Sequence, residues 1–378
     1  MSLQLLVFVL LAQFDWGISS PQNAKPVTVI STWPFTKATD AAWEVLSQSI
    51  YINGEQITST AVNAVVAGCS QAEEDRTITS VGYGCSPDEE GHTTLDAMVI
   101  DGDTMNVGAV AAMPYIRQAA QVAREVLCTT KHSLIVGIKA TEFAMSRGYQ
   151  KQSLDTPESI ELWNKWKAAN CQPNYREPST WIPDPQTQCG PYGPKWTDVQ
   201  QNYELIYPPP SHFNSGYYYH VAQYQTGDRP EGTVDEDHHD TIGMIAIDAY
   251  GSMAVGLSTS GAIHKIPGRV GDTPIPGSGG YVDSEVGGAV GTGDGDVLMR
   301  FSLSFQAVSY MRNGISPEDA CAMSLKSVKQ TEKWSGALVA LNATGHYGAA
   351  CVGFGKFQFA LRSENTGNSS IVLTVDCK

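Results

Sequence analysis

The stretch that decides the fold lies at residues 235–248, which read DEDHHDTIGMIAID. Four acids and two histidines end at Asp240, and an apolar run begins directly after Thr241. The charged part is typical of a solvated loop, whereas isoleucine, methionine and alanine in succession indicate a central, buried strand. The sequence therefore predicts an abrupt passage from an exposed loop into a sheet, with a hydroxyl residue at the boundary.

The pair Asp240–Thr241 also suggests a chemistry. A cut between the two residues would give Thr241 a free α-amino group beside its own hydroxyl. An α-amine titrates at about pH 8, so near neutral pH a useful fraction is a free base that can activate the hydroxyl as a nucleophile. Local composition alone favours the simpler interpretation, in which Asp240 and Thr241 only begin a strand.

Apolar patterns on both sides of this stretch predict a mixed chain. The strands expected are 27–33, 95–101, 104–113, 134–138, three between 241 and 266, 336–342, 348–362 and 371–375. The helices expected are 38–52, 56–68, 116–127 and two after residue 296, the second of which opens with Ser316-Pro317. Irregular loops are expected at 171–240 and 267–296. Pairs of helices alternating with pairs of antiparallel strands indicate the α+β class, as a four-layer αββα sandwich with two mainly antiparallel sheets face to face.

Composition excludes several classes of function. The 378 residues carry 24 basic and 39 acidic side chains, a net charge of −15, which repels nucleic acid and anionic lipid. The run DEDHHD is interpreted as a solvated charge run, and no CxxC occurs, so no metal site is expected. The run GTGDGD at 291–296 lacks the lysine and the helix pattern of a phosphate loop, so no nucleotide binding is expected.

Several features indicate the secretory route. Residues 3–12 form an apolar run too short to span a bilayer, typical of a signal peptide that would end near Ser19 or Ser20, giving a signal over 1–20. The alternative is a buried N-terminal strand or helix, since no Lys or Arg precedes the run. Eight cysteines then suggest disulfides, with Cys171–Cys189 and Cys351–Cys377 favoured by their spacing. Asn342 and Asn368 head glycosylation sequons.

Motifs along the chain resemble one enzyme family. They are STWPF (31–35), SPDEEGHTTLDAMVIDGDTMNVGAV (86–110), NCQPNY (170–175), IPDPQTQCGPY (182–192), HHDTIGMIAID (238–248), STSG (258–261), GRVGDTPIPGSGGY (268–281), TGDGDVLMRF (292–301) and TGHYGAAC (344–351). In this order they resemble the glycosylasparaginases, or aspartylglucosaminidases, of the N-terminal nucleophile hydrolase superfamily. The resemblance covers nearly the whole chain after residue 20.

The resemblance implies a self-processing amidase that needs no cofactor. Autocleavage between Asp240 and Thr241 would give an α subunit (21–240) and a β subunit (241–378), which together form one catalytic domain. The enzyme would cleave the N4-(β-N-acetylglucosaminyl)-L-asparagine bond of small glycoasparagines in a lysosomal or secreted location. The resemblance also implies a dimer of αβ heterodimers.

The resemblance assigns a role to each matching residue. Thr241 would be the nucleophile, and Thr259 would hydrogen-bond its hydroxyl. Arg269 and Asp272 would bind the α-carboxylate and α-ammonium of the substrate, a pairing that suits their charges. The remaining contacts would come from Thr292 and Gly293 at the oxyanion and from Trp33 in the wall of the pocket.

The cysteines depart from the family pattern. A pair expected after the helix near Cys69 is replaced by Ala72 and Thr77, so a Cys69–Cys85 bridge is a candidate substitute. Ala340 stands where relatives have the cysteine that pairs with the equivalent of Cys321, so Cys321 lacks this partner. Cys128 and Cys321 are therefore expected to be free and buried.

Three other functions compete with the glycoasparagine amidase. They are a plant-type asparaginase or isoaspartyl peptidase, an inactive relative with a binding role, and a protease that acts on other chains. Recognition of two free α-groups by Arg269 and Asp272 argues against the protease.

Overall fold

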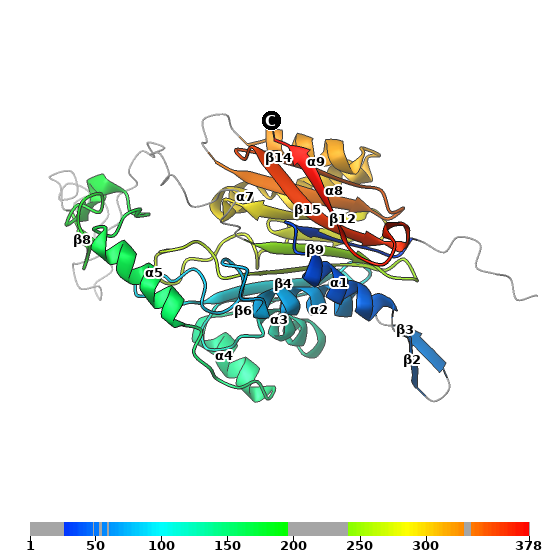
Figure 1. Ribbon diagram of the computed structural model, residues 1–378, viewed down its shortest axis with the longest axis horizontal. Helices are drawn as coiled ribbons and strands as arrows, with labels where there is room; N and C mark the ends of the chain where they lie inside the picture. Colours follow the sequence, from blue (N-terminus) through cyan, green and yellow to red (C-terminus); the bar gives the residue numbers. More distant parts are fainter. Residues whose placement is uncertain are drawn as a thin grey trace, which may run out of the picture.

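The computed structural model describes residues 26–47, 49–52, 55–58, 60–195, 241–328 and 334–377. These residues form two large sheets and eight α-helices, which confirms the predicted α+β class (Figure 1). The expected signal segment 1–20 and Asp240 lie outside the described residues. No described helix has the length and the apolar character needed to cross a bilayer.

The larger sheet has eight strands in the order β16-β15-β1-β9-β10-β4-β5-β6. Their bounds are β1 (Thr28–Thr32), β4 (Leu95–Asp101), β5 (Val107–Met113), β6 (Leu134–Val136), β9 (Ile242–Ile247), β10 (Met253–Thr259), β15 (Lys356–Ser363) and β16 (Ile371–Asp376). All neighbours are antiparallel except β5 and β6. The strand after Thr241 is therefore central, as its unbroken apolar run predicts.

The smaller sheet has four antiparallel strands, β11 (Gly280–Asp283), β12 (Gly287–Gly293), β13 (Gly336–Asn342) and β14 (Tyr347–Val352). The prediction of loops over 267–296 was wrong for β11 and β12. The strand glycines of this segment, such as Gly288, serve close packing between the sheets. A Cβ on Gly288 would lie 2.9 Å from Ile245 Cγ2, and one on Gly243 would lie 2.7 Å from Val290 Cβ.

Helices pack on the outer side of each sheet (Figure 1). Those on the larger sheet are α1 (Thr36–Ser47), α2 (Ala61–Glu74), α3 (Ala119–Thr129) and α4 (Gly137–Ser146), and those on the smaller sheet are α7 (Gly295–Phe301), α8 (Leu303–Arg312) and α9 (Pro317–Lys326). Ser316 caps α9 as predicted, since its side chain accepts from Asp319 N.

Three hydrophobic clusters follow from this order of layers. Because side chains alternate along a strand, Met244 and Ala246 of β9 join the cluster under α1–α3, while Ile245 and Ile247 join the cluster between the sheets. A third cluster, which includes Leu298 of α7, fills the space between the smaller sheet and its helices. Strand β9 is thus buried on both faces.

Other sequence predictions of local structure also need correction, and the single strand expected at 348–362 is two strands, β14 and β15. The helix expected at 38–52 ends at Ser47, and β2 (Ser49–Ile52) follows, paired with β3 (Glu55–Thr58). The helix expected at 56–68 begins only at Ala61, because Thr60 caps it by accepting from Asn63 N. The third strand expected before residue 266 is absent from the described structure, where residues 261–279 form turns.

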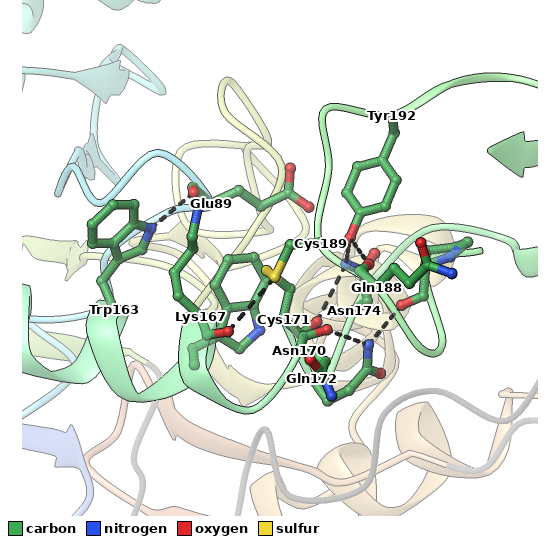
Figure 2. The surroundings of a disulfide bond; sticks show 12 residues. Glu89, Trp163, Lys167, Asn170, Cys171, Gln172, Asn174, Gln188, Cys189 and Tyr192 are labelled. Carbon is green, nitrogen blue, oxygen red and sulfur yellow. Dashed lines mark hydrogen bonds between the residues drawn. A yellow bond between two sulfur atoms is a disulfide. The ribbon is translucent and has the colours of Figure 1, made fainter. Parts of the chain in front are cut away.

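The irregular segment after α5 (Pro157–Ala168) is held by the Cys171–Cys189 disulfide (Figure 2). It includes η1 (Pro178–Thr180), β7 (Trp181–Ile182) and β8 (Gly193–Pro194). Trp163 Nε1 of α5 donates to the carbonyl of Glu89 (2.9 Å), whose own N–H donates to Lys265 O (3.0 Å). Helix α5 is thereby linked through Glu89 to the loop that follows β10.

Cysteine pairing is partly as predicted. Cys171–Cys189 and Cys351–Cys377 are disulfides, and the second joins β14 of the smaller sheet to the end of β16 in the larger one. The Cys69–Cys85 bridge was wrong, because both are free and buried, and Cys85 Sγ donates to the carbonyls of Ile78 and Val81.

The two remaining cysteines differ in their environment. Cys321 is free and buried, as predicted. Cys128 is also free, but the prediction that it is buried was wrong. It lies on the opposite side of α3 from the buried Val126, since two residues along a helix turn the side chain by about 200°.

We predict that Gly68→Ala lowers the free energy of unfolding by about 1–2 kcal/mol. The new Cβ would clash with Met244 Sδ and lie 2.8 Å from the backbone oxygen of Ala38. Overpacking costs about 1–3 kcal/mol and outweighs the gain in helix propensity of about 1 kcal/mol. Urea denaturation measures the change, and Gln71→Ala on the exposed side of α2 is the control. An unchanged midpoint for Gly68→Ala would contradict close packing of α1 on α2.

Candidate active site

Thr241 lies at the entrance of β9 and is 3% exposed. Its carbonyl oxygen accepts two hydrogen bonds, from Thr32 Oγ1 (3.0 Å) and from Thr292 Oγ1 (3.2 Å). Thr32 Oγ1 also accepts from the backbone N–H of Gly243 in β9 (2.9 Å), two residues after Thr241. Hydroxyl groups from β1 and β12 therefore hold the first residue of the strand from two sides.

Trp33 joins the same set of contacts. Its indole Nε1 donates to Thr292 Oγ1 (2.9 Å), and its ring forms T-shaped pairs with Phe354 and Phe357 at 5.5 and 5.0 Å between centroids. The backbone of Trp33 has φ of 61°, a left-handed conformation that is strained for a bulky residue. Such strain persists where the surroundings fix the position of a side chain, and here it points the indole at Thr292.

Gly293 follows Thr292 at the end of β12 and requires glycine. Its φ is 118°, and a Cβ there would lie 2.5 Å from both Ser335 O and Gly336 Cα. The backbone at this position is thus close to the neighbouring strand and free of any side chain. Its N–H is a candidate donor beside the Thr292 hydroxyl.

Thr259 is the last residue of β10, one position beyond the pair Ser258–Ile242, which places it opposite Thr241. Its Oγ1 donates to Ser80 O (3.3 Å) and accepts from Gly261 N (2.9 Å). The hydroxyl is thereby fixed beside the nucleophile candidate at the point where the strand ends.

Arg269 and Asp272 lie together after β10. Arg269 Nη2 donates to Asp296 Oδ2 (3.1 Å), and Asp272 is 3% exposed with no hydrogen-bond partner for Oδ2 among the described residues. Burial raises the pKa of Asp272 to about 7, although the guanidinium of Arg269 opposes the rise. A Cβ on Gly295 would lie 2.7 Å from Asp272 Oδ1, so glycine leaves room for this carboxyl.

One cavity gathers most of the predicted site residues. Its lining consists of Thr241, Thr259, Gly261, Ala262, Arg269, Gly271, Asp272, Thr273, Gly293 and Gly295. Thr292 is outside the lining but donates to the Thr241 carbonyl, and Trp33 in turn donates to Thr292. A threonine hydroxyl, a cation and an acid thus share one small space.

Four residues of this region were missed by sequence reasoning. Thr273 Oγ1 lies 3.3 Å from Thr241 Oγ1, and Thr32 holds the Thr241 carbonyl. Lys265 is buried and donates from Nζ to Ser260 O (2.5 Å), and burial lowers its pKa to about 8. Asp96 Oδ1 accepts from Ala112 N (2.6 Å), and burial raises its pKa. A lysine in the apolar run AIHKI was a usable signal, whereas the two threonines gave none.

Asn342 and Asn368 lie away from the cavity. Asn368 is exposed, whereas Asn342 Oδ1 accepts from the backbone N–H groups of Thr344 and His346. Glycosylation of either residue stays a prediction.

Comparison with known proteins agrees with the motifs. A family model described as Asparaginase matches residues 9–371. A rat protein named N(4)-(beta-N-acetylglucosaminyl)-L-asparaginase is 42% identical over 96% of this chain and 95% of its own length. The mouse protein of that name is 41% identical over 100% and 98%. A Drosophila yakuba protein named as a putative enzyme of this kind is 47% identical over 89% and 78%. The chain therefore belongs to the asparaginase family.

Proposed function

We propose that the protein is an amidohydrolase that cleaves the N4-(β-N-acetylglucosaminyl)-L-asparagine bond in glycoprotein degradation. The observation that carries the proposal is the single cavity in which Thr241, Thr259, Arg269 and Asp272 meet. The names of the rat and mouse relatives support the choice of substrate.

The active form arises by a cut between Asp240 and Thr241. The Thr241 hydroxyl attacks the carbonyl carbon of Asp240, and the acyl group moves from nitrogen to oxygen to give an ester. Water then hydrolyses the ester, which leaves a carboxylate on Asp240 and a free α-amine on Thr241. Because the Thr241 carbonyl is anchored by Thr32 and Thr292, the residue stays in place while its amide bond breaks.

Substrate hydrolysis uses the same hydroxyl. The free α-amine takes the proton of Thr241 Oγ1, the oxygen attacks the side-chain amide carbonyl, and the proton passes to the departing glycosylamine. A β-aspartyl ester forms on Thr241, and water releases aspartate. No cofactor takes part.

Thr292 and Gly293 stabilise the tetrahedral oxyanion in this proposal. The Thr292 hydroxyl donates to Thr241 O in the structure, so its hydrogen must turn toward the oxyanion during the reaction. Trp33 N–H keeps the Thr292 oxygen in position while the hydrogen turns. Removal of one such donor costs about 10²- to 10³-fold in rate in a comparable site.

Arg269 and Asp272 select the aspartyl part of the substrate. The guanidinium pairs with the α-carboxylate, and the Asp272 carboxylate accepts the α-ammonium. Asp296 holds Arg269 from the side and orients it. Both α-groups must be free, so the protein acts after peptide breakdown and leaves internal peptide bonds intact.

The wider organisation follows the same proposal. The layers form an αββα sandwich of the N-terminal nucleophile hydrolase type, in which 21–240 and 241–378 build one catalytic domain. Two such αβ units form a dimer, residues 1–20 act as a signal, and the enzyme is lysosomal or secreted.

A second candidate is an L-asparaginase or isoaspartyl peptidase activity, which the description of the matching family model favours. Both candidates use the same aspartyl recognition and differ only in the leaving group. A panel of glycoasparagine, asparagine and β-aspartyl dipeptides separates them by kcat/KM.

We predict that the mature protein has a chain beginning Thr-Ile-Gly-Met and that Thr241→Ala stays uncut and has no amidase activity. The variant lacks the hydroxyl that both reactions need. Intact mass and N-terminal sequencing report the cut, and release of N-acetylglucosaminylamine reports activity. Thr374→Ala, on the exposed side of β16, is the matched control. Two chains from Thr241→Ala would show that another residue makes the cut.

We predict that Arg269→Lys raises KM for the glycoasparagine by about 10- to 100-fold, because a planar two-pronged contact to the α-carboxylate is lost. Steady-state kinetics measure the change. Arg312→Lys, in an exposed ion pair with Asp283, is the control and keeps the wild-type KM. An unaltered KM in Arg269→Lys would remove Arg269 from substrate recognition.

We predict a pH dependence specific to the α-ammonium. Since the pKa of Asp272 is raised to about 7, the carboxyl becomes protonated below that pH and loses the charge that binds ammonium. The kcat/KM ratio of the aspartyl substrate to the same amide built on succinate falls about tenfold per pH unit below 7. Titration of the Thr241 amine affects both substrates alike and cancels. If the kcat/KM ratio of the two substrates did not change between about pH 5 and pH 7, the result would contradict this role of Asp272.

A further inference from the structure

Glu73 is a buried acid outside the cavity. It lies in the last turn of α2 and is 3% exposed. The C-terminal end of a helix carries partial negative charge, so a carboxyl there gains nothing from its own helix. Its position needs another explanation.

The first contact of Glu73 is with the start of α3. Glu73 Oε1 accepts from Ala120 N (2.8 Å) in the first turn of that helix. The residue that precedes α3, Gln118, makes no side-chain capping bond. Glu73 therefore caps α3 from a different helix.

The second contact is with the strand that carries Thr259. The same Oε1 accepts from Ser258 Oγ (2.7 Å), and Ser258 is completely buried. Thr259 follows directly, with its hydroxyl donating to Ser80 O (3.3 Å). The end of β10 is thus held by Glu73 on one side and by the Ser80 carbonyl on the other.

The backbone of Glu73 also supports the segment that contains Ser80. A Cβ on Gly82 would clash with the carbonyl oxygen of Glu73, so the end of α2 packs directly on the 80–82 turn. One residue therefore contacts both supports of Thr259.

The buried surroundings of Glu73 favour the neutral, protonated form of its carboxyl. Burial raises the pKa of Glu73 to about 8, against the hydrogen bonds from Ser258 and Ala120. Oε2 has no hydrogen-bond partner among the described residues, so no described donor stabilises a negative charge on that oxygen. The described titratable groups whose charge interacts with Glu73 include Glu74, Cys69 and Tyr149, none of which is a cation.

We propose that Glu73 is a positioning residue, which acts through Ser258 to hold Thr259 opposite Thr241. The inference rests on the proposed function, since it assumes that Thr259 sets the reactivity of Thr241. Glu73 touches neither the substrate nor the reacting atoms.

Ser258→Ala tests the link to Thr259 and leaves the cap of α3 in place. We expect kcat to fall about tenfold, the effect of one lost buried hydrogen bond, with KM unchanged. Glu73→Gln keeps the acceptor oxygen for both Ser258 and Ala120, so it retains most of the wild-type kcat, whereas Glu73→Ala does not. Glu74→Gln, one residue further and exposed, is the matched control.

The pH dependence of stability tests the protonated state. The folded pKa of about 8 lies above the ordinary value of 4.5, so the contribution of Glu73 is complete below pH 4.5 and is lost as the pH rises toward 8. Thermal unfolding of Glu73→Gln loses this part of the pH dependence, and Glu74→Gln keeps it.

Hydrogen exchange separates this inference from the proposed function. Peptides covering 257–262 exchange faster in Ser258→Ala and Glu73→Ala, and at the wild-type rate in Glu73→Gln. If the wild-type protein has no amidase activity but these peptides respond as stated, the proposed function fails and the positioning role stands. Wild-type kcat and wild-type exchange in Ser258→Ala overturn the positioning role. If Ser258→Ala fails to fold, the comparison of Glu73→Gln with Glu73→Ala decides the question. The measurements are again kcat and the hydrogen exchange of the peptides covering 257–262.

Discussion

The carbonyl oxygen of Thr241 accepts hydrogen bonds from Thr32 and Thr292, and the arrangement of the site depends on these two bonds. They join β1, β9 and β12, so strands of both sheets meet at one atom. Trp33 donates a hydrogen bond to Thr292, and Gly293 follows Thr292 at the end of β12. The glycines at 243 and 288 allow the sheets to approach, because a Cβ at either position would clash with a side chain of the facing sheet.

A second constraint is the burial of acids and bases around the cavity. Asp272, Asp96, Glu73 and Lys265 are all nearly inaccessible to solvent, and burial shifts the pKa of each toward the neutral form. Charge in such surroundings is costly unless a partner of opposite sign is close. Under the proposed function, a ligand that brings both charges, such as the α-groups of an amino acid, would supply these partners.

Much of this arrangement was predictable from the sequence, and the failures have physical reasons. The unbroken apolar runs of β9 and β10 predicted central strands, and the motifs around Thr241, Arg269 and Thr292 pointed to the residues that meet in the structure. Strands β11 and β12 were missed because their glycines resemble those of loops, although here they serve close packing. The Cys69–Cys85 pairing failed because pairing depends on distances in three dimensions, which spacing along the chain does not give. Thr273 and Thr32 belong to the site only because the fold places them against Thr241, so no sequence pattern around either residue indicates a role.

Strand β9 begins the second half of the chain, yet it pairs with β1 of the first half and β10 of the second. Each disulfide lies within one half, Cys171–Cys189 before the proposed cut and Cys351–Cys377 after it. In the two-chain protein only non-covalent contacts would join the halves, so reassembly after unfolding would require an encounter of two separate molecules. The persistence of the mature protein would then be governed by how slowly it unfolds, and the single precursor chain would be the only form that folds independently of concentration.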